Sequence, residues 1–435
     1  MQTSFTLAQL ADPGIKEADK ILRACVHCGF CTATCPTYVL LGDERDSPRG
    51  RIYLIKDMLE KGRPADAHTV KHIDRCLSCL ACMTTCPSGV HYMHLVDHGR
   101  AHIERTYARP LGDRLLRKMV AAVVPYAGRF RAALTVARFT RVFAPLMPRR
   151  MRAMLALTPR KLPRASTLDR PQTFPAQGAR RKRVALLAGC AQRVLDPEIN
   201  AATIRLLTRH GCEVVIAAGA ECCGALVHHM GLEDRAQAQA KRTIDAWWRA
   251  QEAAPLDAAA LDAVVINTSG CGTTVKDYGF MFRADPAYAG KAAKISSLAR
   301  DVTELMAELG LDGAAAPETL AVAYHSACSM QHGQKINGQP RALLAKSGFA
   351  LLEIPEGHLC CGSAGTYNML QPALARQLQA RKAANVERVK PDAVATGNIG
   401  CMVQIAGATN IPVVHTVQLL DWATGGPRPP QLKRK

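Results

Sequence analysis

The sequence predicts an α+β protein, in which a mainly helical, cysteine-rich N-terminal region precedes two copies of an α/β unit with parallel strands. Three observations lead to this prediction. Eight cysteines occur in two identical spacing patterns within the first ninety residues. After Arg183, short apolar runs alternate with helical patterns, as in proteins with parallel sheets. A set of four cysteines that includes Cys-Cys-Gly occurs twice in this second part.

Chain length and cysteine content limit the classes of protein to consider. A chain of 435 residues is long enough for two or three domains, because single cores rarely grow beyond about 300 residues. The stretch from Met1 to Gly14 lacks the basic flank and apolar run of a secretory signal, so we expect a cytoplasmic protein. In a reducing compartment, seventeen cysteines indicate metal binding or redox chemistry and disfavour disulfides.

The first segment, residues 1–105, contains two cysteine runs with the spacing of bacterial ferredoxins. The runs are Cys25-x-x-Cys28-x-x-Cys31-x-x-x-Cys35-Pro36 and Cys76-x-x-Cys79-x-x-Cys82-x-x-x-Cys86-Pro87. In this pattern three thiolates bind one [4Fe–4S] cluster, and the fourth completes the other cluster. A zinc ribbon is the alternative, but zinc sites usually present two thiols per turn. We therefore expect a two-cluster ferredoxin-type domain, with one cluster on Cys25, Cys28, Cys31 and Cys86 and the other on Cys76, Cys79, Cys82 and Cys35.

Residues between these runs are expected to support the clusters. Arg51–Glu60 is predicted to be a helix, because its apolar residues recur at helical spacing. Gly29 would let backbone amides approach the cluster sulfides closely. Arg49 and Arg51 either raise the reduction potential of a cluster through their positive charge or act as helix-start and salt-bridge residues. The sequence leaves both roles open.

The second segment, residues 106–180, is expected to be a basic helical segment that ends in a linker from Thr158 to Pro175. Between Arg105 and Arg183 there are twenty lysines and arginines but only two acidic residues. Apolar residues alternate with the arginines at helical spacing, and no apolar run approaches the roughly 20 residues that span a bilayer. This amphipathic pattern favours either an anionic membrane surface or a partner subunit. We expect no nucleic-acid partner.

The remaining chain reads as two α/β repeats, residues 181–315 and 316–425, followed by a basic tail, residues 426–435. In the first repeat, predicted strands at 184–188, 213–217 and 263–267 lead to Cys190, to Cys222-Cys223-Gly224 and to Cys271. In the second, strands at 320–324, 349–353 and 392–395 lead to Cys328, to Cys360-Cys361-Gly362 and to Cys401. The first cysteine and the Cys-Cys pair are 32 residues apart in both repeats, which indicates an internal duplication.

Ligands of parallel sheets collect outside the carboxyl ends of the strands, where all of these cysteines fall. We therefore predict that each repeat gathers four thiols as a metal or cofactor site, and four thiols are enough to hold an additional iron–sulfur cluster of the ordinary kind. The alternative is that they are small buried hydrophobic residues, but this does not explain the identical placement. Cys212 has no counterpart in the second repeat and is expected in the core. The candidate ligands are Cys190, Cys222, Cys223 and Cys271, and Cys328, Cys360, Cys361 and Cys401.

Taken over almost its whole length, the chain resembles the iron–sulfur subunits of bacterial glycolate oxidase. The resemblance rests on the stretches 21–36, 48–55, 244–248 and 359–367, and on the combination of ferredoxin runs with two Cys-Cys-Gly repeats. It implies two [4Fe–4S] clusters here, FAD on partner subunits that oxidise glycolate to glyoxylate, and electron flow onward to a membrane or quinone acceptor. D-lactate is a second implied substrate. The same resemblance places the chain in the cytoplasm or on the inner face of the cytoplasmic membrane.

Related architectures keep other functions open. They include the iron–sulfur subunit of anaerobic glycerol-3-phosphate dehydrogenase, subunits of other 2-hydroxyacid dehydrogenases, and heterodisulfide reductase, which cleaves its substrate at the Cys-Cys-Gly sites. The latter ends each repeat with Cys-x-x-Cys, whereas this chain has Thr274 and Gln404 at the last position. We therefore expect an electron-transfer subunit without a substrate-oxidising site of its own. His325 and His332 flank Cys328 and are either further ligands or structural residues.

Overall fold

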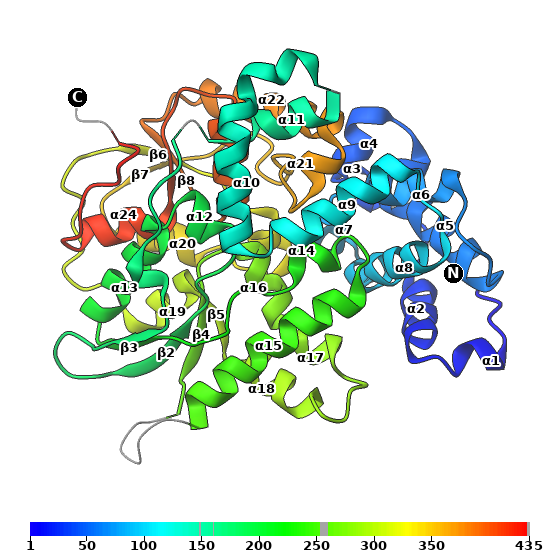
Figure 1. Ribbon diagram of the computed structural model, residues 1–435, viewed down its shortest axis with the longest axis horizontal. Helices are drawn as coiled ribbons and strands as arrows, with labels where there is room; N and C mark the ends of the chain where they lie inside the picture. The colour runs from blue at the N-terminus through cyan, green and yellow to red at the C-terminus, as the bar shows by residue number, and fades with distance from the viewer. Residues whose placement is uncertain (148, 160, 253–259, 433–435) are drawn as a thin grey trace.

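The computed structural model describes residues 1–147, 149–159, 161–252 and 260–432. Figure 1 shows a helical N-terminal body on one side and the two sheets with their covering helices on the other. The helices of the basic segment lie across the boundary between these parts. Both the mainly helical start and the duplicated α/β remainder agree with the predicted fold class.

Eight α-helices and one short 3₁₀-helix make up the described residues of the N-terminal body. They are α1 (Leu7–Leu10), α2 (Pro13–Ala24), α3 (Phe30–Ala33), α4 (Pro36–Leu41), η1 (Glu44–Asp46), α5 (Pro48–Glu60), α6 (Ala67–Asp74), α7 (Ala81–Thr85) and α8 (Tyr92–Thr106). Helix α5 confirms the predicted helix and starts earlier, at Pro48, because the Ser47 side chain caps the amide of Gly50. Its buried face packs with α2, α6 and α8 around Leu22, Ile73 and Leu95.

The basic segment forms α9 (Leu111–Val123), α10 (Ala127–Thr140), the 3₁₀-helix η2 (Arg141–Leu146), α11 (Arg149–Ala156) and the 3₁₀-helix η3 (Thr167–Asp169). One face of α9 packs within the same chain, since Val120 and Ala121 contact Val227 and Met230 of the first repeat. This internal contact was not among the two predicted uses of the segment. No helix in the part of the chain that the structure describes is both long and apolar enough to cross a bilayer.

The first repeat contains a five-stranded sheet in the order β1-β3-β2-β4-β5. Its strands are β1 (Gln172–Phe174), β2 (Lys182–Leu186), β3 (Cys212–Ile216), β4 (Ala263–Ile266) and β5 (Ala299–Asp301). Strand β1 lies inside the expected linker and pairs antiparallel with β3, whereas the other pairs are parallel. The linker prediction is therefore wrong for these three residues, which close one edge of the sheet. Cys212 is fully buried in β3, as expected.

Helices surround this sheet on both faces, which explains why β2 and β4 read as continuous apolar runs. The helices are α12 (Gln192–Leu195), α13 (Glu198–Arg209), α14 (Ala225–His228), α15 (Glu233–Glu252), α16 (Ser269–Lys276), α17 (Tyr278–Met281), α18 (Ala289–Leu298) and α19 (Val302–Leu309).

The second repeat has a four-stranded parallel sheet in the order β7-β6-β8-β9. Its strands are β6 (Ala321–Tyr324), β7 (Ala350–Leu352), β8 (Ala393–Thr396) and β9 (Val413–His415), and its helices are η4 (Ser329–Gly333, a π-helix), α20 (Gln339–Lys346), α21 (Tyr367–Leu370), α22 (Pro372–Arg388), α23 (Ile399–Ala406) and α24 (Thr416–Ala423). This order repeats β3-β2-β4-β5 of the first sheet. A single hydrophobic core joins the two repeats, with Val184, Val265, Val322 and Val414 among its members.

Candidate iron–sulfur and thiol sites

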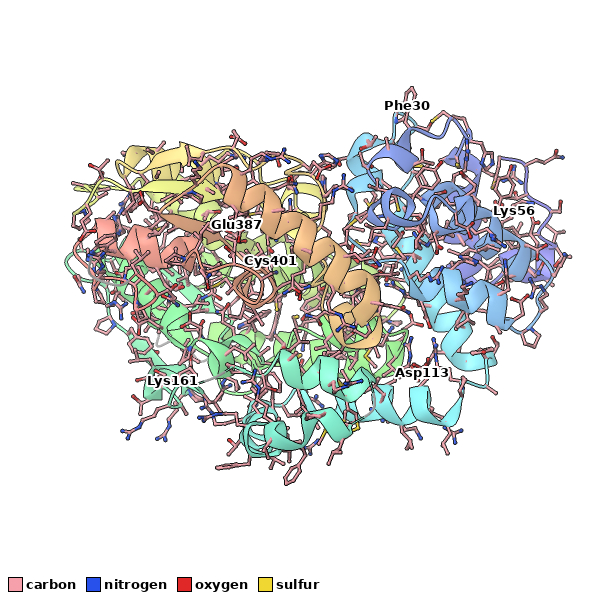
Figure 2. The ribbon with its side chains drawn as sticks, turned by 90° about the horizontal axis from the view of Figure 1, so that it is seen from above. Phe30, Lys56, Asp113, Lys161, Glu387 and Cys401 are labelled. Atoms are coloured by element: carbon pink, nitrogen blue, oxygen red, sulfur yellow. The ribbon has the colours of Figure 1, made fainter. Side chains whose placement is uncertain are left out.

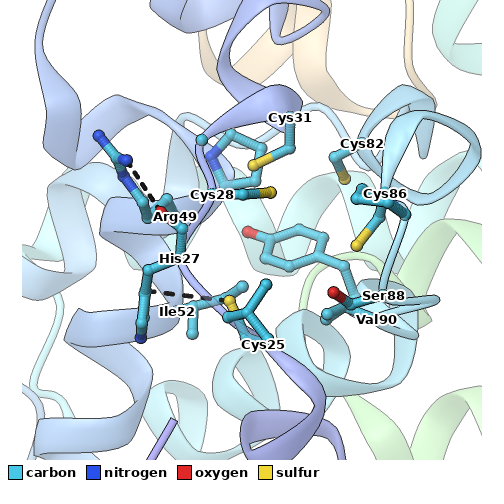
Figure 3. Close-up of a pocket in the computed structure, with 15 residues that line it drawn as sticks. Cys25, His27, Cys28, Cys31, Arg49, Ile52, Cys82, Cys86, Ser88 and Val90 are labelled. Atoms are coloured by element: carbon cyan, nitrogen blue, oxygen red, sulfur yellow. Dashed lines mark hydrogen bonds between the residues drawn. The ribbon is translucent and has the colours of Figure 1, made fainter.

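Five N-terminal thiols line one pocket, here called pocket I, with Cys82 beside Cys25, Cys28, Cys31 and Cys86. Cys25, Cys28 and Cys31 come from the loop before α3 and from α3 itself, and Cys86 comes from the end of α7. Figure 3 shows their sulfur atoms directed toward a common space. Cys25, Cys28, Cys31 and Cys86 are the set that the ferredoxin pattern assigns to one cluster, and four converging thiolates are suited to a [4Fe–4S] cube.

The other four thiols, Cys35, Cys76, Cys79 and Cys82, line an adjoining pocket of about 320 Å³, here called pocket II. Cys82 lines pocket I as well. The two pockets are therefore neighbours, as two clusters that exchange electrons must be. The assignment of individual cysteines to clusters stays a prediction, and the grouping of the thiols supports it.

Both cysteine loops adopt the same unusual backbone. His27 and Ser78 have φ of 57° and 51°, and two residues later Gly29 and Leu80 have φ of 85° and 64°. These left-handed residues turn the chain sharply between successive cysteines, so that the thiols converge on one side. At Gly29 a side chain would also collide with Arg49, since a Cβ atom there would lie 2.9 Å from Nη1. Backbone strain of this kind is typical of ligand-holding loops.

Positive charge is concentrated beside pocket II. Arg51 is buried and lies 3.7 Å from Cys35 Sγ, measured from its Nη1. Arg100 donates to the carbonyl of Cys76 and to Ser78 Oγ. Burial alone would raise the pKa of the Cys76 thiol, but Arg51 and Arg100 outweigh burial and lower it. The lowered pKa favours the thiolate form of Cys76, which is the form that binds iron.

Arg49 and Arg51 each form a salt bridge, and each lies beside a thiol pocket. Arg51 pairs with the buried carboxylate of Asp46 and donates to the carbonyl of His72, so it is structural as well as close to a thiol. Arg49 pairs with Glu44 and donates to the carbonyl of His27 at 3.2 Å, beside pocket I (Figure 3). Each arginine combines a salt bridge with a position next to a candidate cluster.

In each repeat the four cysteines meet at the carboxyl edge of the sheet, as the strand pattern predicted. The first quartet is Cys190, Cys222, Cys223 and Cys271, and the second is Cys328, Cys360, Cys361 and Cys401. Contact with the Cys222 thiol, together with burial, raises the pKa of Cys190. In the same way, contact with Cys361 and burial raise the pKa of Cys401. Apolar surroundings alone would not bring four thiols from distant loops into contact, so these clusters support metal-binding sites.

The second quartet adjoins the ferredoxin-type domain. Cys79, which lines pocket II, packs with Leu77 against Cys328 and Cys360. Burial, followed by the neighbouring Cys328 thiol, raises the pKa of Cys79 well above its usual range. The sequence did not predict this contact, because no local pattern links residues about 250 positions apart.

Heterodisulfide reductase has a fifth cysteine at the end of each repeat, and in this chain the polar residues Thr274 and Gln404 stand at those positions. Thr274 is buried and donates to the carbonyl of Gly270. Gln404 is buried too, donating to the carbonyl of Ala375 and accepting from Asn368. Since both side chains are used in internal hydrogen bonds, the protein is built without the fifth thiol at either site.

The two histidines that flank Cys328 have different surroundings. His332 contacts Thr84 Oγ1 at 2.8 Å through Nδ1, so it links the second repeat to the ferredoxin-type domain. His325 is buried beside the second quartet, and burial lowers its pKa. His332 is therefore a structural residue, whereas His325 faces the thiols.

Comparison with known protein families agrees with this division of the chain. Residues 24–90 match the model of a 4Fe-4S dicluster domain. Residues 184–276 and 322–406 match the model of a cysteine-rich domain. At full length, the chain is 45% identical to the glycolate oxidase iron-sulfur subunit of Escherichia coli, over 97% of this chain and 99% of that protein. The chain belongs to the family of glycolate oxidase iron–sulfur subunits.

Other relatives show how far this family extends. A probable glycolate oxidase iron-sulfur subunit of Bacillus subtilis is 31% identical over 93% of this chain and 94% of its own length. Lactate utilization protein A of Oceanobacillus iheyensis is 25% identical and matches 55% of this chain over 96% of its own length. The family resemblance seen in the sequence is thus confirmed, and with it the iron–sulfur character of the chain.

Proposed function

We propose that this chain is the electron-transfer subunit of a glycolate oxidase complex, in which a partner subunit oxidises glycolate to glyoxylate on a bound flavin. The observation that carries the proposal is the pair of adjoining thiol pockets that share Cys82. Cys25, Cys28, Cys31 and Cys86 would hold one [4Fe–4S] cluster, and Cys35, Cys76, Cys79 and Cys82 the other.

The chemistry of glycolate oxidation requires this division of labour. Conversion of glycolate to glyoxylate releases two electrons and two protons, whereas a [4Fe–4S] cluster accepts one electron at a time. A flavin can take the pair from the substrate and release it in single steps. Two clusters side by side would then carry the electrons away in sequence toward a quinone.

Pocket I is the one that a partner could approach from outside. Cys28 is exposed, and beside it Val26 and Phe30 expose 66% and 62% of their surface. Figure 2 shows Phe30 at the outer edge of the molecule, directed away from it. Exposed apolar side chains around a redox centre are suited to a flavin-bearing partner, because close approach speeds electron transfer and apolar contact excludes water.

Substitution of one ligand in each cluster, assayed in the assembled complex, would test this function. We expect Cys28→Ser and Cys79→Ser to lose about four irons each and to abolish glycolate-dependent quinone reduction. Glycolate should still bleach the flavin of the partner in a single turnover, because that step needs no iron. Quinone reduction at the wild-type rate in either variant would contradict the proposal.

The surface near pocket I needs a separate test. Phe30→Arg should slow electron transfer from the reduced flavin at least tenfold while leaving the iron content unchanged. Leu7→Arg is the matched control, because Leu7 is exposed and apolar but lines neither pocket. Equal rates in the two variants would place the flavin partner elsewhere.

A second substrate follows from the shorter relatives that are named for lactate utilization. We propose D-lactate as an alternative electron source for the complex. Comparison of kcat/KM for glycolate and D-lactate on the same preparation tests this, and only the flavin subunit should determine the ratio. Neither substrate should bleach the iron–sulfur chain by itself.

A further inference from the structure

The two cysteine quartets occupy equivalent places, but their surroundings are not equivalent. Leu187 donates its amide to Val265 at the end of β2, and His325 donates its amide to Ala395 at the end of β6. Each residue lies three positions before the first cysteine of its quartet. The duplication therefore presents an aliphatic side chain to the first quartet and an imidazole to the second.

His325 lacks the hydrogen bonds that a buried histidine normally has. Its side chain is 1% exposed, and no oxygen or nitrogen atom among the described residues pairs with its ring, so the Cys361 thiol is its polar neighbour. A thiol is a weak hydrogen-bond partner, and a buried imidazole that faces only sulfur recovers little of what it lost with water. This arrangement is suited to an imidazole that shares a metal with the thiol.

Two thiols of the second quartet lie close to the His325 ring. One ring nitrogen of His325 and the sulfur atoms of Cys361 and Cys401 all lie within 4.8 Å of one another. Donors bound to one tetrahedral ion, at about 2.3 Å for sulfur and about 2.0 Å for nitrogen, are about 4 Å apart. The three atoms are thus spaced so that a small contraction would let them share one metal.

Lys382 supplies a positive charge beside the same site. It is 2% exposed, donates from Nζ to the carbonyl of Glu356, and lies near Cys328, Cys360 and Cys361. In each repeat an alanine carbonyl lies beside the glycine of Cys-Cys-Gly, Ala236 in the first and Ala375 in the second. Lys382 lies seven residues after Ala375, and the residue seven positions after Ala236 is Thr243. A cation of this kind offsets the negative charge of several thiolates around a divalent ion or cluster.

We propose that the second quartet, together with His325, holds a transition-metal centre that combines thiolate sulfur with one imidazole nitrogen. Cys361 and Cys401 share the metal with His325, and one further thiol of the quartet completes a set of four donors. The first quartet has only thiols and so cannot form the same mixed centre. Metal binding at the second quartet does not depend on whether glycolate is the electron source.

The proposed centre lies next to the ferredoxin-type domain. Cys79, a proposed ligand at pocket II, packs against the hydrophobic cluster that contains Cys328 and Cys360, and the Cys328 thiol is its neighbour. A metal at the second quartet would therefore extend the row of centres from pocket I through pocket II into the second repeat. The labelled Cys401 lies in the interior beneath α22 in Figure 2, remote from the edge that carries Phe30.

Elemental analysis of the full-length chain, purified without oxygen, tests the proposal. Iron, zinc and acid-labile sulfide per chain would be measured for the wild type, His325→Ala and Cys401→Ser. We expect both variants to lose the same single centre, while the electron paramagnetic resonance signals of the two N-terminal clusters persist. Loss of iron with sulfide would identify a cluster and loss of zinc a single ion, and either result supports the proposal.

His332→Ala is the matched control, because His332 is also buried near Cys328 but already has polar partners. It should retain the full metal content. If the lost metal is iron, nitrogen coupling in pulsed resonance spectra of the reduced wild type should be absent from His325→Ala. Wild-type metal content in His325→Ala would overturn the proposal, whether or not Cys401→Ser loses metal, because the imidazole would then not be a ligand.

Discussion

Arg51 and Arg100 place two guanidinium groups beside Cys76, and this residue-scale feature should make the two clusters electronically different. Positive charge stabilises the reduced, more negative form of a cluster. A unit charge about 6 Å away is worth about 3 kcal/mol at an effective dielectric constant of about 20, or about 120 mV for one electron. The cluster of pocket II should therefore have the higher potential and attract electrons from pocket I.

Removing one charge from each pocket would test this difference. We expect Arg100→Gln to lower the reduction potential of the pocket II cluster by tens of millivolts, up to about 100 mV. Arg49→Gln should lower the potential of the pocket I cluster by a smaller amount, because its charge is more exposed to water. Redox titration followed by electron paramagnetic resonance measures both, and equal shifts of both clusters in one variant would contradict the assignment.

At the scale of elements, α9 is fastened to the ferredoxin-type domain by a compact ion-pair cluster. Asp74, at the end of α6, pairs with Arg109 at 2.7 Å and with Arg117 of α9 at 2.9 Å. Burial would raise the pKa of Asp74, but Arg117 and Arg109 outweigh burial and lower it. Its contribution to stability is thus present above pH of about 4 and is lost as the pH falls through the lower, folded-state pKa.

The predicted cost of breaking this cluster is large. Asp74→Asn removes the carboxylate that two nearly buried guanidinium groups share, although both keep Asp113 and Arg109 also keeps Glu104, so we expect a loss of about 2 kcal/mol in the free energy of unfolding. Asp57→Asn is the control, since Asp57 pairs with Lys61 and Arg63 at the surface and should cost under about 1 kcal/mol. Urea titration measures both. Similar costs would mean that the buried cluster does not hold α9 in place.

At the scale of the whole molecule, a titratable pair joins the N-terminal body to the first repeat. Asp97 of α8 lies 3.3 Å from His228 of α14. Burial opposes both charges, yet His228 lowers the pKa of Asp97 to about 2 and Asp97 raises the pKa of His228. Arg100 and His229 also face Asp97, and Asp277 and Glu233 also face His228.

This pair should make the union of the two parts depend on pH. The Asp97 contribution is present above about pH 4, and the His228 contribution is present below about pH 6.5 and lost as the pH rises through the raised pKa. We expect the free energy of unfolding to fall between pH 6.5 and 9 in the wild type. In His228→Gln, which cannot titrate, urea titrations should show a flatter profile. An identical slope in both proteins would assign the effect to other groups.

The basic segment offers a second prediction at this scale, for a membrane surface. Phe139, Val142 and Leu146 are exposed by 78%, 73% and 85%, next to Arg138 and Arg141. We expect the chain to float with vesicles that contain phosphatidylglycerol, and to lose at least tenfold in affinity when Phe139 and Leu146 are changed to serine. High salt should weaken binding further, because each basic residue near such a surface adds about 1 kcal/mol.

Two outcomes of the flotation experiment would count against a membrane role. Binding to neutral vesicles that equals binding to anionic ones, or an unchanged affinity of the double serine variant, would contradict a membrane role. Arg149 and Arg150 add charge to the same segment in the sequence, but their side chains lie outside the described residues. Arg138 and Arg141 are therefore the better positions for charge neutralisation.

Local patterns in the sequence were sufficient for much of the fold. The spacing of Cys25 to Cys35 and of Cys76 to Cys86 predicted two thiol groups, because a tight turn between close cysteines is a local property of the backbone. Six strands of the repeats were predicted from their apolar runs. The short strands β1, β5 and β9 were missed, because β1 and β5 contain polar residues and the apolar run of β9 is only two residues long after Pro412.

What the sequence determined by itself was the identity and number of the thiols and the duplication that arranges eight of them in two quartets. Only the tertiary structure decided that Cys79 lies against Cys328 and that α9 packs on the first repeat. It also decided that the ring of His325 faces the thiols of Cys361 and Cys401. Such contacts join residues far apart in the chain, and they depend on how whole domains bury apolar surface against one another, which no local pattern specifies.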